Sequence, residues 1–342
     1  MGFRSRRLII AIVAFAMLAA CGGTGSSGGA GAQTVSLKIM VGGLNKQIYL
    51  PNMLAQRLGY FQEQHLDVTL IDEGSGQASE DEVVAGNVDA GSGAYVHPMV
   101  LNALGKKIET ICQFGIAPGE AEMVDAKKAG SIQSAADLQG KNLGVTDIGS
   151  GTHTLSLAIL GRANIDPTKE HFVAVGAGDT FIAAVKQQRI DAGMTTEPTI
   201  SRLVSTGDGK VLVDLRTPES TRAALGGDYP FIGIFAKNDW VNGNKDTVQR
   251  LVNAYVKTLK FIHSHTAAEI ADKMPPDYYA GNKDLYVTAL QNQLAIFGTD
   301  CRMPAGGPET VEKIQQDYVP SFKGKSANLS ETYTNEFADK AS

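Results

Sequence analysis

Hydrophobic positions along the chain switch repeatedly between two spacings. From residue 35 onward, short apolar runs such as 35–42 and 66–72 alternate with longer segments, such as 50–61, whose apolar residues recur every three or four positions. The short runs predict strands and the longer segments predict helices, because side chains repeat every two residues in a strand and every 3.6 residues in a helix. Their alternation predicts an α/β fold built from mostly parallel sheets flanked by helices.

One phrase occurs twice within this alternation. Asp-Ala-Gly follows a polar residue and a β-branched residue both at 87–91 and at 189–193, each time between a predicted helix and a predicted strand. The copies diverge directly after the glycine. We interpret the shared part as the scaffold of two equivalent α/β units, 36–121 and 129–230, and the divergent parts as ligand-facing, because ligands bind beyond the carboxyl ends of strands in open α/β sheets. A chance recurrence of a common helix–strand turn is the alternative.

The first 34 residues have the pattern of a targeting signal followed by a linker. Three arginines precede an apolar run over 8–20, which ends at Cys21. As a helix this run would span about 20 Å, which is short for a ~30 Å hydrocarbon core but typical of a signal peptide. The residues before Cys21 resemble a bacterial lipobox, which implies a signal peptide at 1–20 and a lipid on the Cys21 sulfur. A plain secretory signal or a short membrane anchor is the alternative, and the Gly/Ser-rich segment 21–34 predicts a flexible tether.

The composition describes a soluble globular protein with room for about two domains. Of the 342 residues, 43 % are hydrophobic and 20 % are charged, and the formal net charge is −5. This acidic balance excludes nucleic acid as a partner, because nucleic-acid binding depends on cation–phosphate contacts. The chain also lacks a nucleophile elbow, a His-Glu-x-x-His motif, a Walker loop and a dinucleotide-binding glycine motif. We therefore expect a binding protein that is not an enzyme, with no cofactor and no metal.

Two cysteines remain when Cys21 is set aside, Cys112 and Cys301. An even pair in an oxidising compartment can form a disulfide. Two buried thiols are the alternative, and the sequence leaves both open.

An ordered set of short motifs resembles one protein family. The chain is similar to the periplasmic solute-binding proteins of ABC importers, specifically the group for nitrate, alkanesulfonates, taurine and thiamine-pyrimidine precursors. The resemblance covers most of 36–265 in the family's order, and the tail after about 275 has no counterpart. The motifs that carry it lie at 49–51, 54–72, 74–77, 83–91, 131–145, 149–153, 173–179, 187–198 and 248–262.

The resemblance implies a two-lobed periplasmic-binding-protein fold in which two crossing strands, near 122–128 and 230–237, form the hinge. Lobe I would comprise 36–121 and 235–342, and lobe II would comprise 125–230, with a small-molecule ligand between them. It also implies a monomeric, lipid-anchored receptor on the extracytoplasmic or periplasmic face of the cell envelope, which delivers its ligand to an ABC permease and its ATPase. An exported enzyme of the same fold, acting on a small heterocycle or an organic anion, is the alternative.

Two glycine-containing turns are the strongest candidates for ligand contact. The turns 75–77 and 149–153 each follow a predicted strand or its end and begin a predicted helix. Free N–H groups and the helix dipole at such an end favour an anionic or electron-rich group, and glycine permits close approach. Ordinary helix capping by Ser75 and Ser150 is the alternative.

The remaining candidates follow the carboxyl ends of other predicted strands. After the first copy of the repeated phrase, the ring of Tyr95 can stack on a ligand or pack beneath the next helix. After the second copy, Glu197 can accept a hydrogen bond from a ligand amine or simply favour the first turn of a helix. No arginine lies in these loops to clamp a carboxylate, so we rank sulfonates and related small organic anions first and pyrimidine-type heterocycles second. The full predicted set is Gly43, Asn45, Tyr49, Ser75, Gly76, Gln77, Ser92, Tyr95, His97, Ser150, Gly151, Thr152, His153, Thr196 and Glu197.

Overall fold

A computed structural model describes residues 33–341 of the chain. The predicted signal peptide, the predicted lipid site at Cys21 and all but the end of the predicted tether lie outside the described residues. None of the helices in the described part is both long and apolar enough to cross a membrane.

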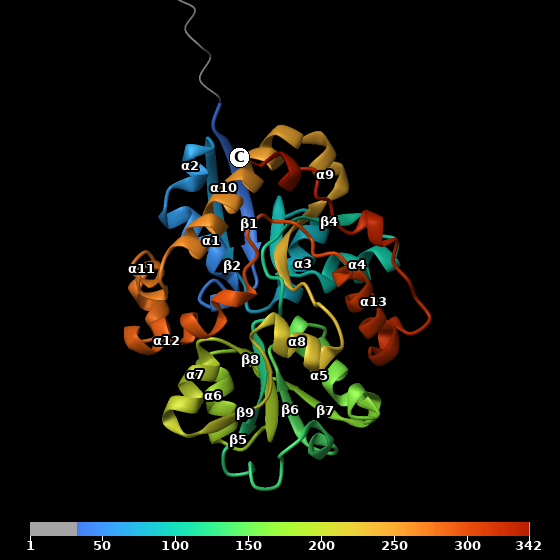
Figure 1. Cartoon of the computed structure of the whole chain (residues 1–342). Coiled ribbons are helices and arrows are strands. Elements are labelled where there is room, and N and C mark those ends of the chain that lie inside the picture. Colours follow the sequence, from blue (N-terminus) through green and yellow to red (C-terminus); the bar gives the residue numbers. More distant parts are fainter. Residues whose placement is uncertain (1–32, 342) are drawn as a thin grey trace, which may run out of the picture. The chain divides into compact units, whose positions relative to one another are not determined.

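The first of two five-stranded sheets has the strand order β2-β1-β3-β10-β4. Strand β10 runs antiparallel to both of its neighbours, whereas β1 is parallel to β2 and β3. Every residue of β3 and β4 is buried, because helices pack on both faces of the sheet (Figure 1). The strands are β1 (Val35–Val41), β2 (Leu66–Asp72), β3 (Ala90–Ala94), β4 (Ile108–Gln113) and β10 (Ile232–Lys237).

The second five-stranded sheet repeats this arrangement with the order β7-β6-β8-β5-β9. Here β5 is the antiparallel fourth strand, and β6 is parallel to β7 and β8. Strand β6 therefore takes the place of β1, and β8 takes the place of β3. The strands are β5 (Glu120–Asp125), β6 (Asn142–Val145), β7 (His171–Ala174), β8 (Ala192–Thr196) and β9 (Gly209–Leu215).

The two antiparallel strands carry the chain from one lobe to the other. Strand β5 follows the first four strands of the chain but pairs in the second sheet, and β10 follows the second sheet but pairs in the first. This topology confirms the predicted two-lobed α/β fold with two crossing strands. The two copies of the repeated phrase lead into β3 and β8, each of which lies beside the crossing strand of its own sheet. One local structure is thus used twice.

Helices of the first lobe include a break that the sequence pattern does not predict. The segment 50–61, expected as one helix, forms α1 and α2, because Gly59 between them has a left-handed φ of 75°. The long α10 packs its apolar stripe against α1, α2 and β4. These helices are α1 (Leu50–Arg57), α2 (Tyr60–Glu63), α3 (Gly76–Ala85), α4 (Val96–Ala103) and α10 (Lys245–Ser264).

Among the described residues, four helices cover the second lobe, and four more follow β10 in the C-terminal part of the chain. The lobe helices are α5 (Gly151–Arg162), α6 (Asp179–Lys186), α7 (Thr199–Thr206) and α8 (Pro218–Leu225). The others are α9 (Asn238–Gly243), α11 (Ala267–Ala271), α12 (Lys283–Gln293) and α13 (Gly307–Tyr318). Short 3₁₀ helices connect these elements, among them η1 (Gln47–Tyr49) and η6 (Pro320–Phe322).

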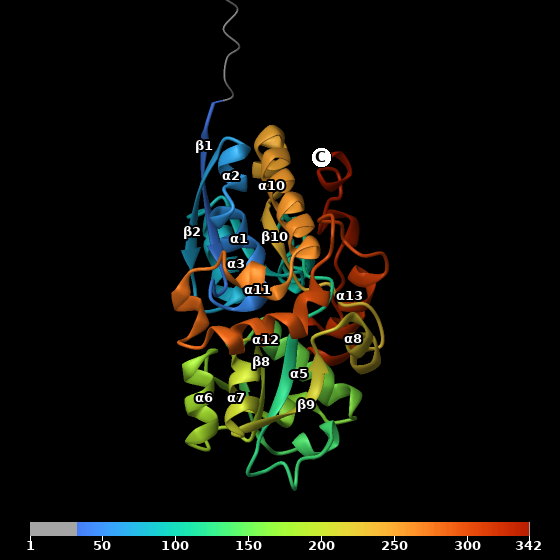
Figure 2. The same cartoon turned by 60° about the vertical axis from the view of Figure 1, so that its left-hand side comes forward.

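The C-terminal region packs against both lobes. Helix α12 packs on α7 (Figure 2), and α13 packs on α5 and α4. The sequence assigned the whole tail to lobe I, whereas these contacts extend it along lobe II as well. Within the first lobe, Cys112 of β4 and Cys301, which precedes α13, form a disulfide.

Candidate ligand-binding site

The carboxyl ends of four strands meet at a small pocket between the lobes, here called the inner pocket. Its volume is about 20 Å³, and residues that follow β1, β3, β6 and β8 line it together with both crossing segments. Direct contacts close the cleft: the Gln47 N–H donates to the Glu197 carbonyl at 3.1 Å, and Ser75 Oγ donates to Asp147 Oδ2 at 3.4 Å. A volume of this size suits a water molecule, so a larger ligand enters only when the lobes separate. The lining residues are Lys46, Ile48, Tyr49, Gly76, Ala94, His97, Glu120, Thr146, Ser150, Gly151, Thr152, Thr196, Phe231 and Ile232.

Both predicted helix-terminal turns reach the inner pocket. Ser75 and Ser150 cap α3 and α5, each accepting a backbone N–H of the first turn, at 3.2 and 3.4 Å. Gly76 and Gly151, which follow these caps, line the pocket from opposite lobes. Capping is therefore what places the two glycines at the cleft.

Hydroxyl groups of the second lobe form a chain along one wall of the inner pocket. Ser150 Oγ and Thr152 Oγ1 lie 2.7 Å apart, and Thr152 Oγ1 lies 2.8 Å from Thr146 Oγ1. Thr196, at the end of β8, adds a fourth hydroxyl. Because a hydroxyl both donates and accepts, this wall can adapt to either kind of ligand group.

Two buried charged side chains of the inner pocket were missed from the sequence. Lys46 Nζ donates to the carbonyl oxygens of Gly42 (2.6 Å) and Gly74 (2.9 Å), and burial lowers its pKa to about 8 despite the opposing charges of Glu120 and Asp72. Glu120 is 3 % exposed, and its Oε2 has no hydrogen-bond partner among the described residues. Burial raises the pKa of Glu120 well above its usual range, with Lys46 opposing that shift. The acid at the start of β5 was the available signal, but the sequence analysis placed the crossing two residues later, near 122–128.

His97 is shared between the inner pocket and a larger cavity beside it. Its Nδ1 lies 2.7 Å from Glu80 Oε2, while its buried Nε2 has no partner within the described part of the chain. Tyr49 also lines the inner pocket, and burial raises the pKa of its phenol, which therefore stays protonated. Both side chains can thus offer a hydrogen bond to a bound molecule.

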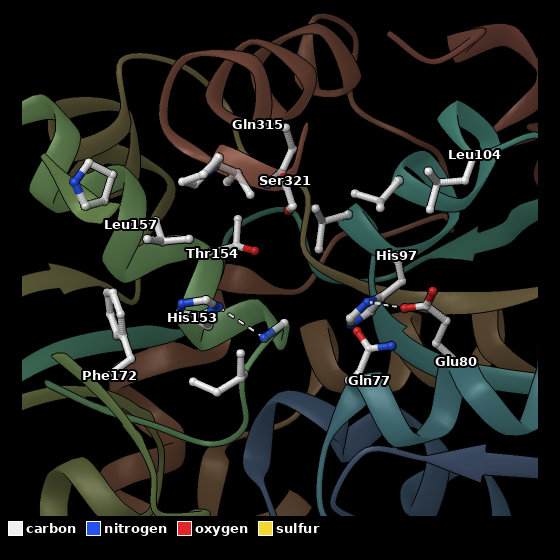
Figure 3. Close-up of a pocket in the computed structure, with 17 residues that line it drawn as sticks. Gln77, Glu80, His97, Leu104, His153, Thr154, Leu157, Phe172, Gln315 and Ser321 are labelled. Atoms are coloured by element: carbon white, nitrogen blue, oxygen red, sulfur yellow. Dashed lines mark hydrogen bonds and ion pairs between the residues drawn. The ribbon is translucent and has the colours of Figure 1, made fainter. Parts of the chain in front are cut away.

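The larger cavity, here called the side cavity, has a volume of about 530 Å³ (Figure 3). The predicted residues Gln77, His97 and His153 all line it, so the predicted set is divided between two spaces. His153 Nδ1 accepts the Gly149 N–H at 3.0 Å, and burial lowers the pKa of the ring. The neutral ring then carries its proton on Nε2.

Two predicted residues lie at a third space. Gly43 and Asn45 line a cavity of about 340 Å³ together with Lys46, Asp72 and residues 176–178 of the second lobe. Lys46 separates this space from the inner pocket because it lines both. Contact of Gly43 and Asn45 with a ligand stays a prediction.

Three residues of the predicted set are engaged inside the protein, and their contact with a ligand stays a prediction. Ser92 Oγ accepts from Asn52 Nδ2 at 3.0 Å inside the first lobe. The buried Tyr95 hydroxyl lies 2.5 Å from Thr332 Oγ1 of the C-terminal region. Glu197 is fully buried and accepts hydrogen bonds from Arg216 Nη1 (2.7 Å) and the Ser201 N–H (2.9 Å). Each of these polar groups is engaged by the protein itself, and none lines the three spaces described above.

Comparison with known proteins assigns the chain to a family. A profile described as NMT1/THI5 like matches residues 48–268, which is more than half of the chain. The chain belongs to the NMT1/THI5-like family. This finding and the fold confirm the resemblance stated above. Among curated relatives, the chain is 25 % identical over 156 residues to 4-amino-5-hydroxymethyl-2-methylpyrimidine phosphate synthase THI11 of Saccharomyces cerevisiae, which covers 44 % of the chain and 42 % of that protein. The chain thus matches about two fifths of the length of this relative.

Solved structures agree with the fold. A protein of Bordetella bronchiseptica is 31 % identical and superposes with a TM-score of 0.85 over 89 % of this chain and 96 % of its own. The alkanesulfonate-binding protein SsuA of Xanthomonas axonopodis pv. citri, bound to MOPS, is 17 % identical, with a TM-score of 0.66 over 89 % of this chain and 99 % of its own. At that identity the likeness shows the fold alone.

The expectation that the chain is not an enzyme is wrong, because relatives of the chain are named as enzymes. The yeast relative is named as a synthase, and so is a Legionella pneumophila relative that is 27 % identical over 146 residues. Lack of common catalytic motifs therefore does not separate binding proteins from enzymes in this family.

Proposed function

We propose that the chain is an extracytoplasmic solute-binding protein of an ABC import system, which holds a small polar solute between its lobes. The observation that carries this proposal is the convergence of Gly76, Gly151 and the Glu120 carboxyl group, whose Oε2 has no partner among the described residues, on one pocket. Two lobes that meet around buried, unused hydrogen-bonding groups suit reversible capture by closure.

The charges of the inner pocket revise the order of ligand classes. Burial favours the protonated form of Glu120, whose carboxyl group can both donate and accept, and Lys46 and the hydroxyl wall can donate to a ligand as well. A pyrimidine-type heterocycle with an exocyclic amine has hydrogen-bond donors and acceptors on neighbouring atoms. An amino-sulfonate such as taurine also has both, but two methylene groups separate them. Nitrate and simple sulfonates accept hydrogen bonds but donate none, so they would leave the acceptor oxygen of the Glu120 carboxyl group unpaired, which costs free energy. We therefore rank the heterocycle first and simple sulfonates last.

The cellular setting belongs to the same proposal. The apolar run at 8–20 and Cys21 favour a lipid-anchored protein that acts as a monomer and passes its ligand to a permease and its ATPase. Replacement of Cys21 with alanine should move the protein from the membrane fraction to the soluble fraction. Unchanged membrane retention would argue against the anchor.

A thermal-shift screen tests the ligand. Pyrimidines, taurine, alkanesulfonates and nitrate are added to the full-length protein, and each stabilising compound is recovered and identified by mass spectrometry. At a hundred times its dissociation constant, a true ligand should add about 2.7 kcal/mol to the free energy of unfolding. Glu120→Leu, which removes both carboxyl oxygens at similar size, should weaken a donor-bearing ligand by about 0.5–1.5 kcal/mol, the usual net contribution of a hydrogen bond between uncharged groups.

A matched control uses another buried acid. Glu109 of β4 is 9 % exposed and does not line the inner pocket, so Glu109→Leu should leave ligand binding unchanged. Equal loss in both variants would argue against Glu120 as the contact. A synthase-type activity is the second candidate function, favoured by the names of the curated relatives. Recovery of a stabilising compound in a chemically changed form would favour this enzymatic function over simple binding.

A further inference from the structure

We infer that the side cavity is a second ligand site, which takes an uncharged, mostly apolar small molecule, and that its occupancy favours the closed arrangement of the lobes. The binding part is independent of the proposed function. The volume of about 530 Å³ lies within the range of small-molecule sites, which is about 300–1,000 Å³.

The lining of the side cavity selects against charged ligands. More than half of the residues that line it are apolar, and no lysine or arginine is among the described residues around it. The one acid of the lining, Glu80, is already engaged with His97 Nδ1 at 2.7 Å. An anion would find no cation here. The apolar lining residues are Val96, Val100, Leu104, Ile148, Leu157, Pro167, Phe172, Val319 and Pro320.

A few polar groups give the cavity a means of orienting its ligand. His97 is 2 % exposed, and its Nε2 is without a partner in the described part of the chain. His153 lies on the other side, with the hydroxyl of Thr154 between the two rings (Figure 3). The Nε2–H of neutral His153 and the Thr154 hydroxyl are donors, so a ligand with a carbonyl or ether oxygen fits best.

The side cavity is distinct from the inner pocket. The His97 ring stands between the two spaces because it lines both of them. Beside it, Gln77 of α3 reaches across to the opposite lobe, where a Cβ on Gly149 would lie 3.3 Å from Gln77 Oε1. A molecule in the side cavity therefore leaves the cleft free for the transported solute.

Both lobes and the C-terminal region build the side cavity. Val100 and Leu104 come from α4 or its end, Leu157 comes from α5, and Val319 and Pro320 follow α13. Leu104 and Ile148, from opposite lobes, are 55 % and 51 % exposed, so apolar surface remains for a ligand to cover. A ligand that touches both lobes binds the closed arrangement better than the open one and shifts the population toward it.

The test titrates the full-length protein with prodan, an uncharged naphthalene ketone whose emission shifts to the blue in apolar surroundings. Val100→Trp and Val319→Trp fill the cavity from two different elements. Val204→Trp is the matched control, because Val204 of α7 is exposed and does not line the cavity. We expect single-site binding that each filling variant weakens by about tenfold or more, and that the control changes by less than about twofold.

Further measurements separate the possible failures. Glu120→Gln should leave prodan binding unchanged, because Glu120 does not line the side cavity; a loss there would place prodan in the cleft and overturn the inference. If a tryptophan variant fails to fold, Thr154→Val, which removes only a hydroxyl, should still weaken prodan several-fold. Saturating prodan should also reduce the radius of gyration measured by X-ray scattering. Equal prodan affinity in all folded variants would show that prodan does not bind in the side cavity. An unchanged radius of gyration would show that occupancy of this cavity does not favour the closed arrangement.

Discussion

Glu122 lies in the middle of the crossing strand β5 and is fully buried. Its Oε2 accepts from Ser156 Oγ at 2.8 Å, and its Oε1 has no partner among the described residues. Burial raises the pKa of Glu122 to about 8. The folded protein therefore holds a proton near pH 7 that the unfolded chain has already released.

This difference predicts a pH dependence of stability. Between pH 4.5 and about 8 the folded state binds more protons than the unfolded state, so the free energy of unfolding falls as the pH rises. Glu122→Gln removes this penalty. The variant should be more stable than the wild type at pH 8.5, by on the order of 1–4 kcal/mol, and similar to it at pH 5. Urea denaturation at both pH values measures the difference.

The exposed Glu331 provides the control for this experiment. Glu331→Gln should follow the wild type at both pH values, because a solvated glutamate has no burial penalty to lose. The charge of Glu122 also raises the pKa of Glu120, so its removal eases the burial penalty of Glu120 at high pH and adds to the expected difference in the same direction. A Glu122→Gln profile that parallels the wild type would show that Glu122 is ionised at neutral pH.

At the scale of elements, hydrophobic periodicity predicted most strands and helices but not their pairing. The motif at 248–262 became part of α10, and the repeated phrase entered β3 and β8. The reversal of β5 and β10 within each sheet depends on contacts between distant segments, which a local pattern does not contain. The Gly59 break between α1 and α2 depends on a backbone conformation that glycine permits but does not require.

The candidate site was predictable only where a local rule places a residue at a strand end. The turns at Gly76 and Gly151 follow from helix starts, and both reach the inner pocket. Glu197 meets the same local rule, yet Arg216 from a later strand end engages it. Glu120 could not be found this way, because it faces the cleft from the beginning of a crossing strand.

At the scale of the whole molecule, the C-terminal region ties the two lobes to each other. Helix α13 lies so close to α5 that a Cβ on Gly161 would lie 2.1 Å from the Tyr318 ring. Opening of the cleft must therefore shift or bend this contact as well as the crossing strands. The closed arrangement is held by packing on two sides, at the inner pocket and at α13.

Gly151 is the position at which closure can be tested most directly. A Cβ on Gly151 would lie 2.5 Å from Phe231 Cζ and 3.3 Å from Ala94 Cβ, so a side chain there cannot fit while the lobes touch. Gly151→Val should hold the lobes apart and increase the radius of gyration. Because opening relieves the clash, the melting temperature without ligand should change little. The stabilisation of about 2.7 kcal/mol expected from a cleft ligand at a hundred times its dissociation constant should be mostly lost.

Gly243→Val is the matched control, because Gly243 is also helical and a Cβ there meets nothing within 4 Å. It should keep both the wild-type radius and the ligand stabilisation. X-ray scattering and thermal shift on the two variants separate closure from a general effect of replacing a helical glycine. If Gly151→Val keeps the wild-type radius and the full ligand shift, ligand binding does not require the two helix-terminal turns to meet. In that case the solute binds outside the inner pocket, and the side cavity becomes the first place to look for it.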